Sequence, residues 1–327
     1  MLRGMTFAPQ TQIRPGTHLP FTVENAADMG ISRHELRTGP YRRVMRGVYI
    51  HERIPDALPV RARAALLAAP PGGILSHGTA ASLWNARVRR SAEIHIAYRG
   101  TGQPTRRSEI KVHRFTYPLE RKARHGLPVT SPGMTFMQMA VCWDLVELTT
   151  FGDLLVKKGV ITVGELRSYA QAWQFHGAEA GRRAAALVRD RAESVPESHL
   201  RLLLVLAGLP EPEVNYSIRN AVGDEVYRLD LAYPEIRVAV EYDGRWHHTD
   251  EQRAKDGRRR DVLRARGWTI FVVTAEGLYE EPEPTLDEIE EALKDRGLLL
   301  PERSFEYLRY FGSVLPLEEN PYWSVAT

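Results

Sequence analysis

Apolar and polar residues alternate along residues 225–243 more regularly than elsewhere in the chain. A period of two is typical of β-strands, so the pattern predicts strands at about 225–232 and 236–243. Tyr233, Pro234 and Glu235 lie between them as turn residues, which predicts a hairpin. One face is expected to hold Leu229, Leu231, Val238, Val240 and Tyr242. The other face is expected to hold Arg228, Asp230, Ala239, Glu241 and Asp243.

Helical patterns flank this hairpin on both sides. The segment "PESHLRLLLVLAGLP" predicts a buried helix with Pro196 in its first turn. Thr249 and Gln252 form a capping-box sequence that predicts a second helix of about four turns, ended by Gly267. The apolar run "WTIFVVT" then predicts a buried central strand.

Residues 21–50 show two short helix patterns, joined by a glycine turn, and then an alternating stretch. The first helix is expected to start after Thr22, and Ser32 with Glu35 is a capping-box sequence that predicts a second helix at about 33–38. The segment "RRVMRGVY" alternates in the manner of a small β-wing. Together these elements predict a winged helix-turn-helix.

Residues 60–150 have a mixed α/β pattern, with helices near 60–69 and through "HGTAASLW" and strands at "EIHIAY" and "IKVHRF". Ser76 and His77 could indicate a site, but a serine before a helix is more often a cap and a lone histidine is more often structural. Residues 150–192 predict a helical connection with an exposed charged face. The sequence has no Walker P-loop, dinucleotide glycine fingerprint or nucleophile elbow, which disfavours those enzyme classes.

Composition and charge narrow the class of protein. The 327 residues are 43% hydrophobic and 26% charged, as expected of two or three folded domains. The net charge is only +3, but 38 of the 44 basic residues are arginine, which suits bidentate phosphate contacts. A single cysteine, Cys142, argues against a disulfide framework or a Cys-rich zinc site and favours a reducing compartment. Without a signal peptide or membrane-length apolar stretch, we expect a cytoplasmic protein with no membrane contact.

Asp230 and Glu241 are the candidate metal ligands. A turn centred near residues 234–235 would make them diagonal cross-strand neighbours, about 7–8 Å apart at the backbone. Carboxylates gathered on one face need a cation, and hard oxygen ligands select Mg²⁺ or Mn²⁺. Such an ion activates water for phosphodiester hydrolysis. The alternative is a solvent-facing polar hairpin in which Asp243 and Gly244 are simply a turn pair.

Two groups of cations are candidates for contacts with nucleic acid. The first surrounds the predicted second helix and wing near the N-terminus, where phosphates would lie: Arg33, His34, Arg37, Arg42, Arg43 and Arg46. The second forms a stripe at helical spacing on the basic helix after the hairpin: Arg253, Arg260 and Arg264. The alternative for the first group is a protein-contact module with a solvated basic face.

The segment from Glu197 to about Tyr279 resembles the DUF559 domain, a relative of the very-short-patch repair endonucleases in the PD-(D/E)XK nuclease superfamily. The segments that carry the resemblance are "PESHLRLLLVLAGLP", "RLDLAYPEIRVAVEYDGRWHH", "DGRRRDVLRARGW" and "IFVVTAEGLY", in the expected order. Residues 21–50 resemble the winged helix of AbiEi-type antitoxin regulators. "LSHGTAASLW" and "GLPVTSPGMTFMQMA" resemble the middle segment of that group.

The resemblance implies a restriction-endonuclease-like α/β/α sheet domain in which Asp230 and Glu241 bind metal and Glu197 is an additional acid. The family's usual lysine, two residues after the glutamate, is replaced by Asp243. That lysine normally orients water or stabilises negative charge. Either His247, His248 or Arg253 substitutes for it, or the site binds nucleic acid without cutting it. The candidate catalytic residues are therefore Glu197, Asp230, Glu241, Asp243, His247 and His248.

The sequence thus predicts an α/β multi-domain protein with Mg²⁺ or Mn²⁺ as cofactor and DNA, expected to be double-stranded, as partner. Two functions remain open: a metal-dependent DNA endonuclease, and a non-catalytic DNA-binding regulator of the antitoxin kind with a degenerate nuclease fold. A toxin partner and a homodimer are both compatible with the sequence. The expected divisions are a winged helix at 1–55, a mixed α/β domain at 56–150, a helical linker at 151–192, a nuclease-like domain at 193–300 and a tail at 301–327.

Overall fold

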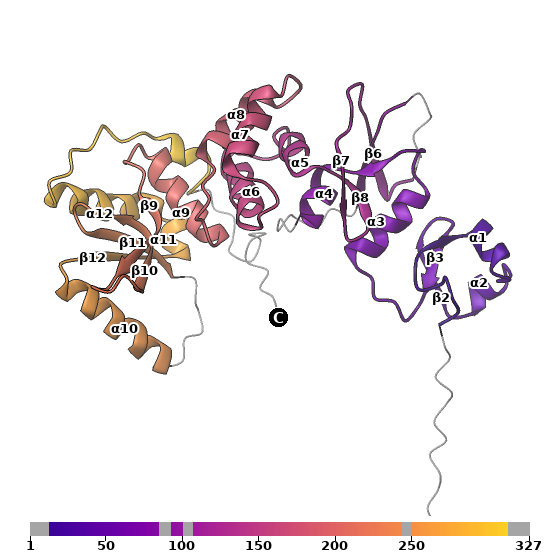
Figure 1. Ribbon diagram of the computed structural model, residues 1–327, viewed down its shortest axis with the longest axis horizontal. Helices are drawn as coiled ribbons and strands as arrows, with labels where there is room; N and C mark the ends of the chain where they lie inside the picture. The colour runs from indigo at the N-terminus through magenta and orange to yellow at the C-terminus, as the bar shows by residue number, and fades with distance from the viewer. Residues whose placement is uncertain (1–12, 85–92, 101–106, 244–249, 313–327) are drawn as a thin grey trace, which may run out of the picture. The chain divides into compact units, whose positions relative to one another are not determined.

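The computed structural model describes residues 13–84, 93–100, 107–243 and 250–312, and only the backbone of residues 250–256. Contacts divide the described chain into two compact units, residues 13–84 with 93–100 and 107–135, and residues 136–243 with 250–312. The protein is mixed α/β with three sheets (Figure 1). The division falls inside the expected middle domain of residues 56–150, and the expected linker of residues 151–192 is part of the second unit.

A three-stranded sheet begins the first unit. Its strands lie in the order β1 (Phe21–Thr22), β3 (Val48–His51) and β2 (Tyr41–Met45), with helices α1 (Val23–Asp28) and α2 (Glu35–Thr38). The predicted capping box is confirmed, because Ser32 and Glu35 exchange hydrogen bonds of 3.1 and 3.2 Å. The second helix is shorter than predicted, because residues 33–34 form a turn before it.

A five-stranded sheet completes the first unit. Its strands lie in the order β6 (Ile110–Arg114), β5 (Ile94–Tyr98), β4 (Ile74–Leu75), β8 (Leu127–Thr130) and β7 (Arg121–Arg124). Helices α3 (Leu58–Leu67) and α4 (His77–Leu83) pack on this sheet. The predicted helices and strands between residues 60 and 115 are therefore confirmed. The β7–β8 pair was not predicted.

Helices begin the second unit. They are α5 (Pro132–Met139), which starts at the end of the first unit, α6 (Leu145–Lys157), α7 (Val163–Ala172), α8 (Ala178–Leu187) and α9 (Val195–Leu206). The predicted helical character of residues 150–192 is confirmed, but it is divided among separate helices that pack on one another. Close packing requires a glycine at position 152 of α6, because a Cβ there would lie 2.4 Å from a Val188 methyl carbon.

Helices α6 and α9 are joined by a buried ion pair. Arg201 donates to Asp153 Oδ2 at 3.1 Å, and the two side chains are 0% and 1% exposed. The hydroxyl of Ser198 donates to the same oxygen at 2.7 Å. The backbone N–H of Arg189 donates to the other oxygen at 2.8 Å. These bonds satisfy the Asp153 carboxylate and fix α9, whose first turn carries Glu197, against α6.

A four-stranded sheet lies at the centre of the C-terminal part, in the order β12 (Thr269–Thr274), β11 (Val238–Asp243), β10 (Glu225–Tyr233) and β9 (Glu213–Arg219). Strands β11 and β12 are parallel, and the other pairs are antiparallel. The prediction that "WTIFVVT" is a central strand is wrong, because β12 pairs only with β11 among the described residues and lies at the edge. Its side chains are mostly half-buried.

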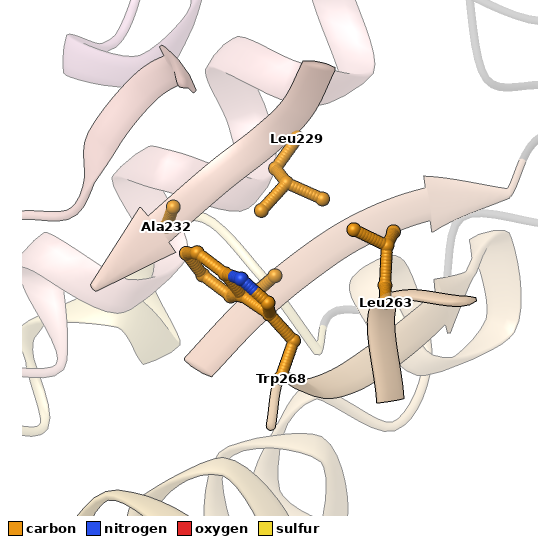
Figure 2. Packing of buried hydrophobic residues seen from close by; sticks show 5 residues of the cluster. Leu229, Ala232, Leu263 and Trp268 are labelled. Atoms are coloured by element: carbon orange, nitrogen blue, oxygen red, sulfur yellow. The ribbon is translucent and has the colours of Figure 1, made fainter. Parts of the chain in front are cut away.

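Helix α10 (Asp250–Ala265) covers the sheet and is followed by Gly267 in the left-handed region at φ +84°. The predicted four-turn helix and its glycine stop are confirmed. Figure 2 shows Leu263 of α10 and Trp268 packed toward Leu229 and Ala232 of β10. The remaining elements are α11 (Ala275–Tyr279), α12 (Pro282–Asp295) and the 3-10 helix η1 (Glu306–Arg309). Tyr307 of η1 is fully buried, so part of the expected tail packs on the unit.

The hairpin of β10 and β11 differs from its prediction in two ways. Its loop is residues 234–237 and its register pairs Leu231 with Val240 as the last pair, so the register that would make Asp230 and Glu241 diagonal neighbours is wrong. Strict alternation is also wrong, because Leu229 shares one buried cluster with Ala232 and Ala239. The neighbouring strand β9 is irregular at this point. Its residue Asn215 lies between the residues that pair with Leu229 and Leu231, and it has φ +49°. Such a residue breaks the regular pleat of a strand.

No helix in the described part of the chain combines the length and apolar character needed to cross a membrane.

Candidate functional site

The hairpin opens at Asp230. The ladder between β10 and β11 ends at the Leu231–Val240 pair, although both strands continue, β10 paired to β9 and β11 paired to β12. Beyond the last pair, the carboxylate of Asp230 accepts the backbone N–H of Tyr242 at 3.0 Å. The side chain thus satisfies a backbone donor at the fork, which holds the carboxylate between the two strands.

Asp230 lies in an environment rich in negative charge. The pKa of Asp230 is raised from 3.8 to about 7. Burial is the main cause, and the nearby carboxylates of Glu197 and Glu241 contribute to the same rise. The Tyr242 N–H and the Arg259 guanidinium oppose the rise. Two of the predicted site acids therefore raise the pKa of the third, and Arg259 only partly offsets them.

Glu241 binds Arg259 through both carboxylate oxygens. Nη2 of Arg259 lies 2.6 Å from Oε1, and Nη1 lies 2.9 Å from Oε2. Glu241 is 8% exposed, and Arg259 also donates to the backbone carbonyl of Arg228 at 2.6 Å. The sequence analysis did not select Arg259. The available signal was its position four residues before the buried Leu263, which places both side chains on the inner face of α10.

Glu197 lies in the first turn of α9, where Ser194 caps the helix. Its Oε2 atom accepts the N–H of Glu193 and the side-chain amide of Asn215, each at 3.1 Å. Asn215 also donates to the Arg191 carbonyl at 2.6 Å. The irregular residue of β9 therefore fixes the orientation of Glu197 beside the fork.

Asp243 occupies the position where the family has a lysine, so the side chain there is acidic in this protein. Asp243 lies 3.7 Å from Arg260 of α10 as an ion pair. Arg260, which was predicted to contact phosphate, is therefore already paired with an acid of the protein. The same is true of Arg264, which pairs with Asp261 at 3.5 Å. His247 and His248 lie outside the described residues, and the side chain of Arg253 is also outside them. Positive charge at the site comes from α10.

A pocket of about 790 Å³ borders this constellation. It is connected to the site through Asn215, which bonds Glu197, and through Arg228, whose carbonyl bonds Arg259. Its charged lining consists of Lys157, Arg191, Arg219 and Arg228 with Asp190, Glu193 and Glu213. The predicted set of nucleic-acid contacts contained none of these cations.

The N-terminal cations differ in exposure. Arg33, His34, Arg37, Arg43 and Arg46 are exposed. Arg42 is half-buried and donates to the carbonyl of Ile54 from both Nε and Nη2, at 3.3 and 3.0 Å. Arg42 therefore ties β2 to the segment that follows β3, whereas the other five present their charge to solvent.

The acids at the fork have the donor chemistry that Mg²⁺ or Mn²⁺ requires. Among the described residues, the carboxylate oxygens of Glu197, Asp230 and Glu241 do not all lie within 4.8 Å of one another, so the three do not form a three-carboxylate metal site. Mg²⁺ usually takes only one or two carboxylates and completes its shell with water and phosphate. Each carboxylate oxygen has two acceptor lone pairs, so the bonds from Tyr242 and Arg259 leave lone pairs on Asp230 and Glu241. The residues fit a divalent ion of this kind.

The raised pKa of Asp230 gives a stability test without divalent ions. The folded protein keeps Asp230 neutral up to about pH 7, whereas unfolded aspartate ionises near 3.8, so stability is lost as pH rises through this interval. Asp230→Asn cannot ionise, and we expect it to melt at least about 2 °C above the unaltered protein at pH 8. The difference should vanish near pH 4.

Calorimetric melting in EDTA at both pH values measures this effect, with Asp261→Asn as the exposed control. An equal difference between Asp230→Asn and the unaltered protein at both pH values would contradict the electrostatic account.

Comparison with known proteins places this geometry in a family. A family model described as REase_MTES_1575 matches residues 209–293, which contain β9, β10, β11, α10 and β12. The "Uncharacterized protein Rv2248" of Mycobacterium tuberculosis (strain ATCC 25618 / H37Rv) is 30% identical over 254 residues, or 76% of this chain and 90% of that protein. The "Uncharacterized protein MT2308" of strain CDC 1551 / Oshkosh gives the same values. The chain therefore belongs to the family of these two mycobacterial proteins, and its residues 209–293 form a restriction-endonuclease-like domain.

Proposed function

We propose that the protein is a metal-dependent DNA endonuclease whose site is the fork between β10 and β11. The observation that carries this proposal is the geometry of the fork, where the Asp230 carboxyl accepts the Tyr242 N–H between two strands and lies near Glu197 and Glu241. Burial and these two like charges raise the pKa of Asp230, which supports the proposal. Strongly perturbed carboxyls beside like charges are typical of functional sites. The restriction-endonuclease-like match over residues 209–293 supports phosphodiester hydrolysis as the reaction class.

Each residue of the fork has a distinct role in this proposal. Asp230 and Glu241 would hold Mg²⁺ or Mn²⁺, with Glu197 as an additional acid. A bound divalent ion would supply charge stabilisation for the phosphoryl oxygens and lower the pKa of water. The Tyr242 N–H orients Asp230, and Arg259 orients Glu241. Arg259 would also supply the positive charge that the family's lysine normally provides.

Two surfaces support DNA as the substrate. The pocket that borders the fork has four cations, Lys157, Arg191, Arg219 and Arg228, against three acids, and guanidinium groups suit phosphate. Arg228 also pairs with Glu193 and Glu225. In the first unit, α1, α2 and the β2–β3 hairpin are compatible with a small winged helix-turn-helix, and five exposed cations surround it. We propose that this segment holds DNA while the C-terminal domain cuts it.

The function is tested by incubating purified protein with supercoiled plasmid and Mg²⁺ or Mn²⁺. We expect nicked and linear products with either ion and none in EDTA. DNA binding should persist in EDTA and weaken with salt, because phosphate contacts release counterions. An absence of cleavage with both ions, together with retained salt-sensitive binding, would contradict the endonuclease and support the regulator.

The regulator is the second candidate, favoured by one observation. Asp243 stands where the family has lysine, and Arg260 pairs with it. A site without that lysine could retain DNA binding while losing hydrolysis, which would suit an antitoxin-like regulator with a toxin partner.

Arg259 is the residue that separates these two candidates within the domain. We expect Arg259→Met to lower the cleavage rate by about 10²–10³-fold, the usual cost of removing one charge-stabilising group. Arg259→Lys should retain part of the rate, because it keeps the charge but loses the bidentate geometry. The exposed neighbour Arg258→Met is the matched control.

Single-turnover rates at saturating DNA measure the effect of Arg259, and melting curves check the fold. Equal rates for Arg259→Met and Arg258→Met would exclude a role for Arg259 in cleavage.

A further inference from the structure

Three histidines of the first unit meet at one place, far along the sequence from the acidic fork. His77 begins α4, His95 lies on β5 and His113 lies on β6. One side-chain nitrogen from each lies within 4.8 Å of the other two. His77 is buried and the other two are half-buried. Histidine is the side chain most often used to bind transition metals in proteins.

The backbone around the cluster brings these three residues together from separate elements. Strands β5 and β6 are parallel, and Ala97 pairs with His113, so His113 is diagonal to His95 on the neighbouring strand. The start of α4 is tied to β5 by the bond from Ser76 N–H to the His95 carbonyl at 3.0 Å. The His95 N–H donates to the Thr79 hydroxyl at 2.9 Å. These two bonds hold the backbone of His95 against the first turn of α4, where His77 lies.

The distance between two of the donor nitrogens is close to that in a metal site. His113 Nε2 lies 3.1 Å from His95 Nδ1, within hydrogen-bond distance. Two nitrogens on one tetrahedral Zn²⁺, each about 2.0–2.1 Å from the ion, are about 3.3 Å apart. The rings of His77 and His113 are stacked with centroids 3.8 Å apart, so they would rotate to direct their lone pairs at one ion. No two of the donor nitrogens are more than 4.8 Å apart. The most distant pair would therefore need to approach by at most about 1.5 Å to reach the spacing found on Zn²⁺.

His77 has two features unusual for a structural histidine. Its φ is +46°, in the left-handed region, where a non-glycine residue is uncommon and often marks a functional position. Its Nδ1 lies 3.1 Å from the Ser76 hydroxyl, although Ser76 makes no side-chain cap bond to α4. A metal-binding histidine usually has its second nitrogen bonded in this way, which fixes the tautomer. Ser76 is the N-cap residue of α4, as the sequence predicts, but its hydroxyl contacts His77 and makes no bond to the helix backbone.

We propose that His77, His95 and His113 bind a transition-metal ion of the Zn²⁺ class. Three nitrogen donors favour Zn²⁺ or a similar ion over Mg²⁺, which prefers oxygen. The group has three members among the described residues, and zinc sites with three protein ligands keep a position for water or another ligand. The site is independent of the acidic fork in both residues and metal preference.

Metal binding by the untagged, EDTA-treated full chain tests this proposal. We expect one Zn²⁺ per chain in a titration of the Asp230→Asn variant against a chromophoric chelator, because the carboxylates of the unaltered fork also suit Zn²⁺. Co²⁺ should give the intense visible absorption of a four- or five-coordinate site, which six-coordinate Co²⁺ lacks. His95→Gln and His113→Gln should each lower Zn²⁺ affinity by more than about 100-fold, a larger loss than is usual for a residue that bonds a ligand without touching the metal.

Two controls separate the site from other metal binding. His176→Ala removes an exposed histidine outside the cluster and should leave Zn²⁺ affinity unchanged. Asp230→Asn should also leave it unchanged. Zn²⁺ should raise the melting temperature of the unaltered protein, because it binds only the folded state, and this measurement remains valid if a histidine variant folds poorly.

The proposal would be overturned by an unaltered chain that binds no stoichiometric Zn²⁺ or shows no rise in melting temperature. It would also be overturned if a folded His113→Gln variant kept its Zn²⁺ affinity.

Discussion

Asp230→Asn and Glu241→Gln are each expected to lower the rate of Mg²⁺-dependent DNA cleavage by about 10³-fold or more. Metal-ion charge stabilisation is worth several kcal/mol in the transition state, and each 1.36 kcal/mol corresponds to a tenfold change in rate. Both substitutions keep the side chain's shape, and the asparagine oxygen can still accept the Tyr242 N–H. Glu241→Gln keeps only one of the two acceptors of Arg259, so melting curves check that this variant is folded. In a folded variant the loss reflects the missing charge.

Plasmid nicking under single-turnover conditions measures this effect, with Asp261→Asn as the control because Asp261 is an exposed acid of α10. DNA affinity measured in EDTA should change less than threefold in both variants. Cleavage that persists in either variant at more than about a tenth of the original rate would show that these carboxylates are not required.

Asp153→Ala is expected to lower the free energy of unfolding by about 3–5 kcal/mol. The substitution leaves Arg201, whose side chain is fully buried, without its buried counterion, and an unpaired buried charge is strongly destabilising. Glu211 would remain 3.1 Å from Arg201, but its side chain is 31% exposed and its charge is partly screened. Because the pair joins α6 to α9, we also expect Glu197 to lose its fixed position.

Urea denaturation measures the stability change, and Asp261→Ala is the matched control. That residue forms an exposed pair with Arg264, so its removal should cost less than about 1 kcal/mol. The double variant Asp153→Leu with Arg201→Met should recover part of the loss, because apolar replacements remove both buried charges. A double variant less stable than Asp153→Ala would contradict this explanation.

Local sequence patterns predicted where helices and strands begin and end better than they predicted which strands pair with one another. The capping box at Ser32, the helix starting near Pro196 and the glycine stop at Gly267 all depend on a few adjacent residues, and the structure confirms them. The edge position of β12 was missed because an apolar run indicates burial but not the number of neighbouring strands. The hairpin register was missed because the turn includes Arg237, a non-glycine residue at φ +53°.

The site was partly predictable for a related reason. The resemblance and the acidic pattern selected Glu197, Asp230 and Glu241, and the structure places their charges close enough to shift one pKa. Arg259 was missed because its role depends on the placement of α10 against the sheet. The histidine cluster was missed because its members come from three elements that are adjacent only in the fold.

Mn²⁺ binding to the fork is the most direct test of the central claim that Asp230 and Glu241 share a divalent ion. It can be measured by electron paramagnetic resonance of free Mn²⁺, in protein carrying His113→Gln so that the histidine cluster does not contribute. We predict one bound Mn²⁺ per chain, lost on adding Asp230→Asn or Glu241→Gln and retained on adding Asp261→Asn. No bound Mn²⁺, or binding equal in all of these proteins, would contradict the account.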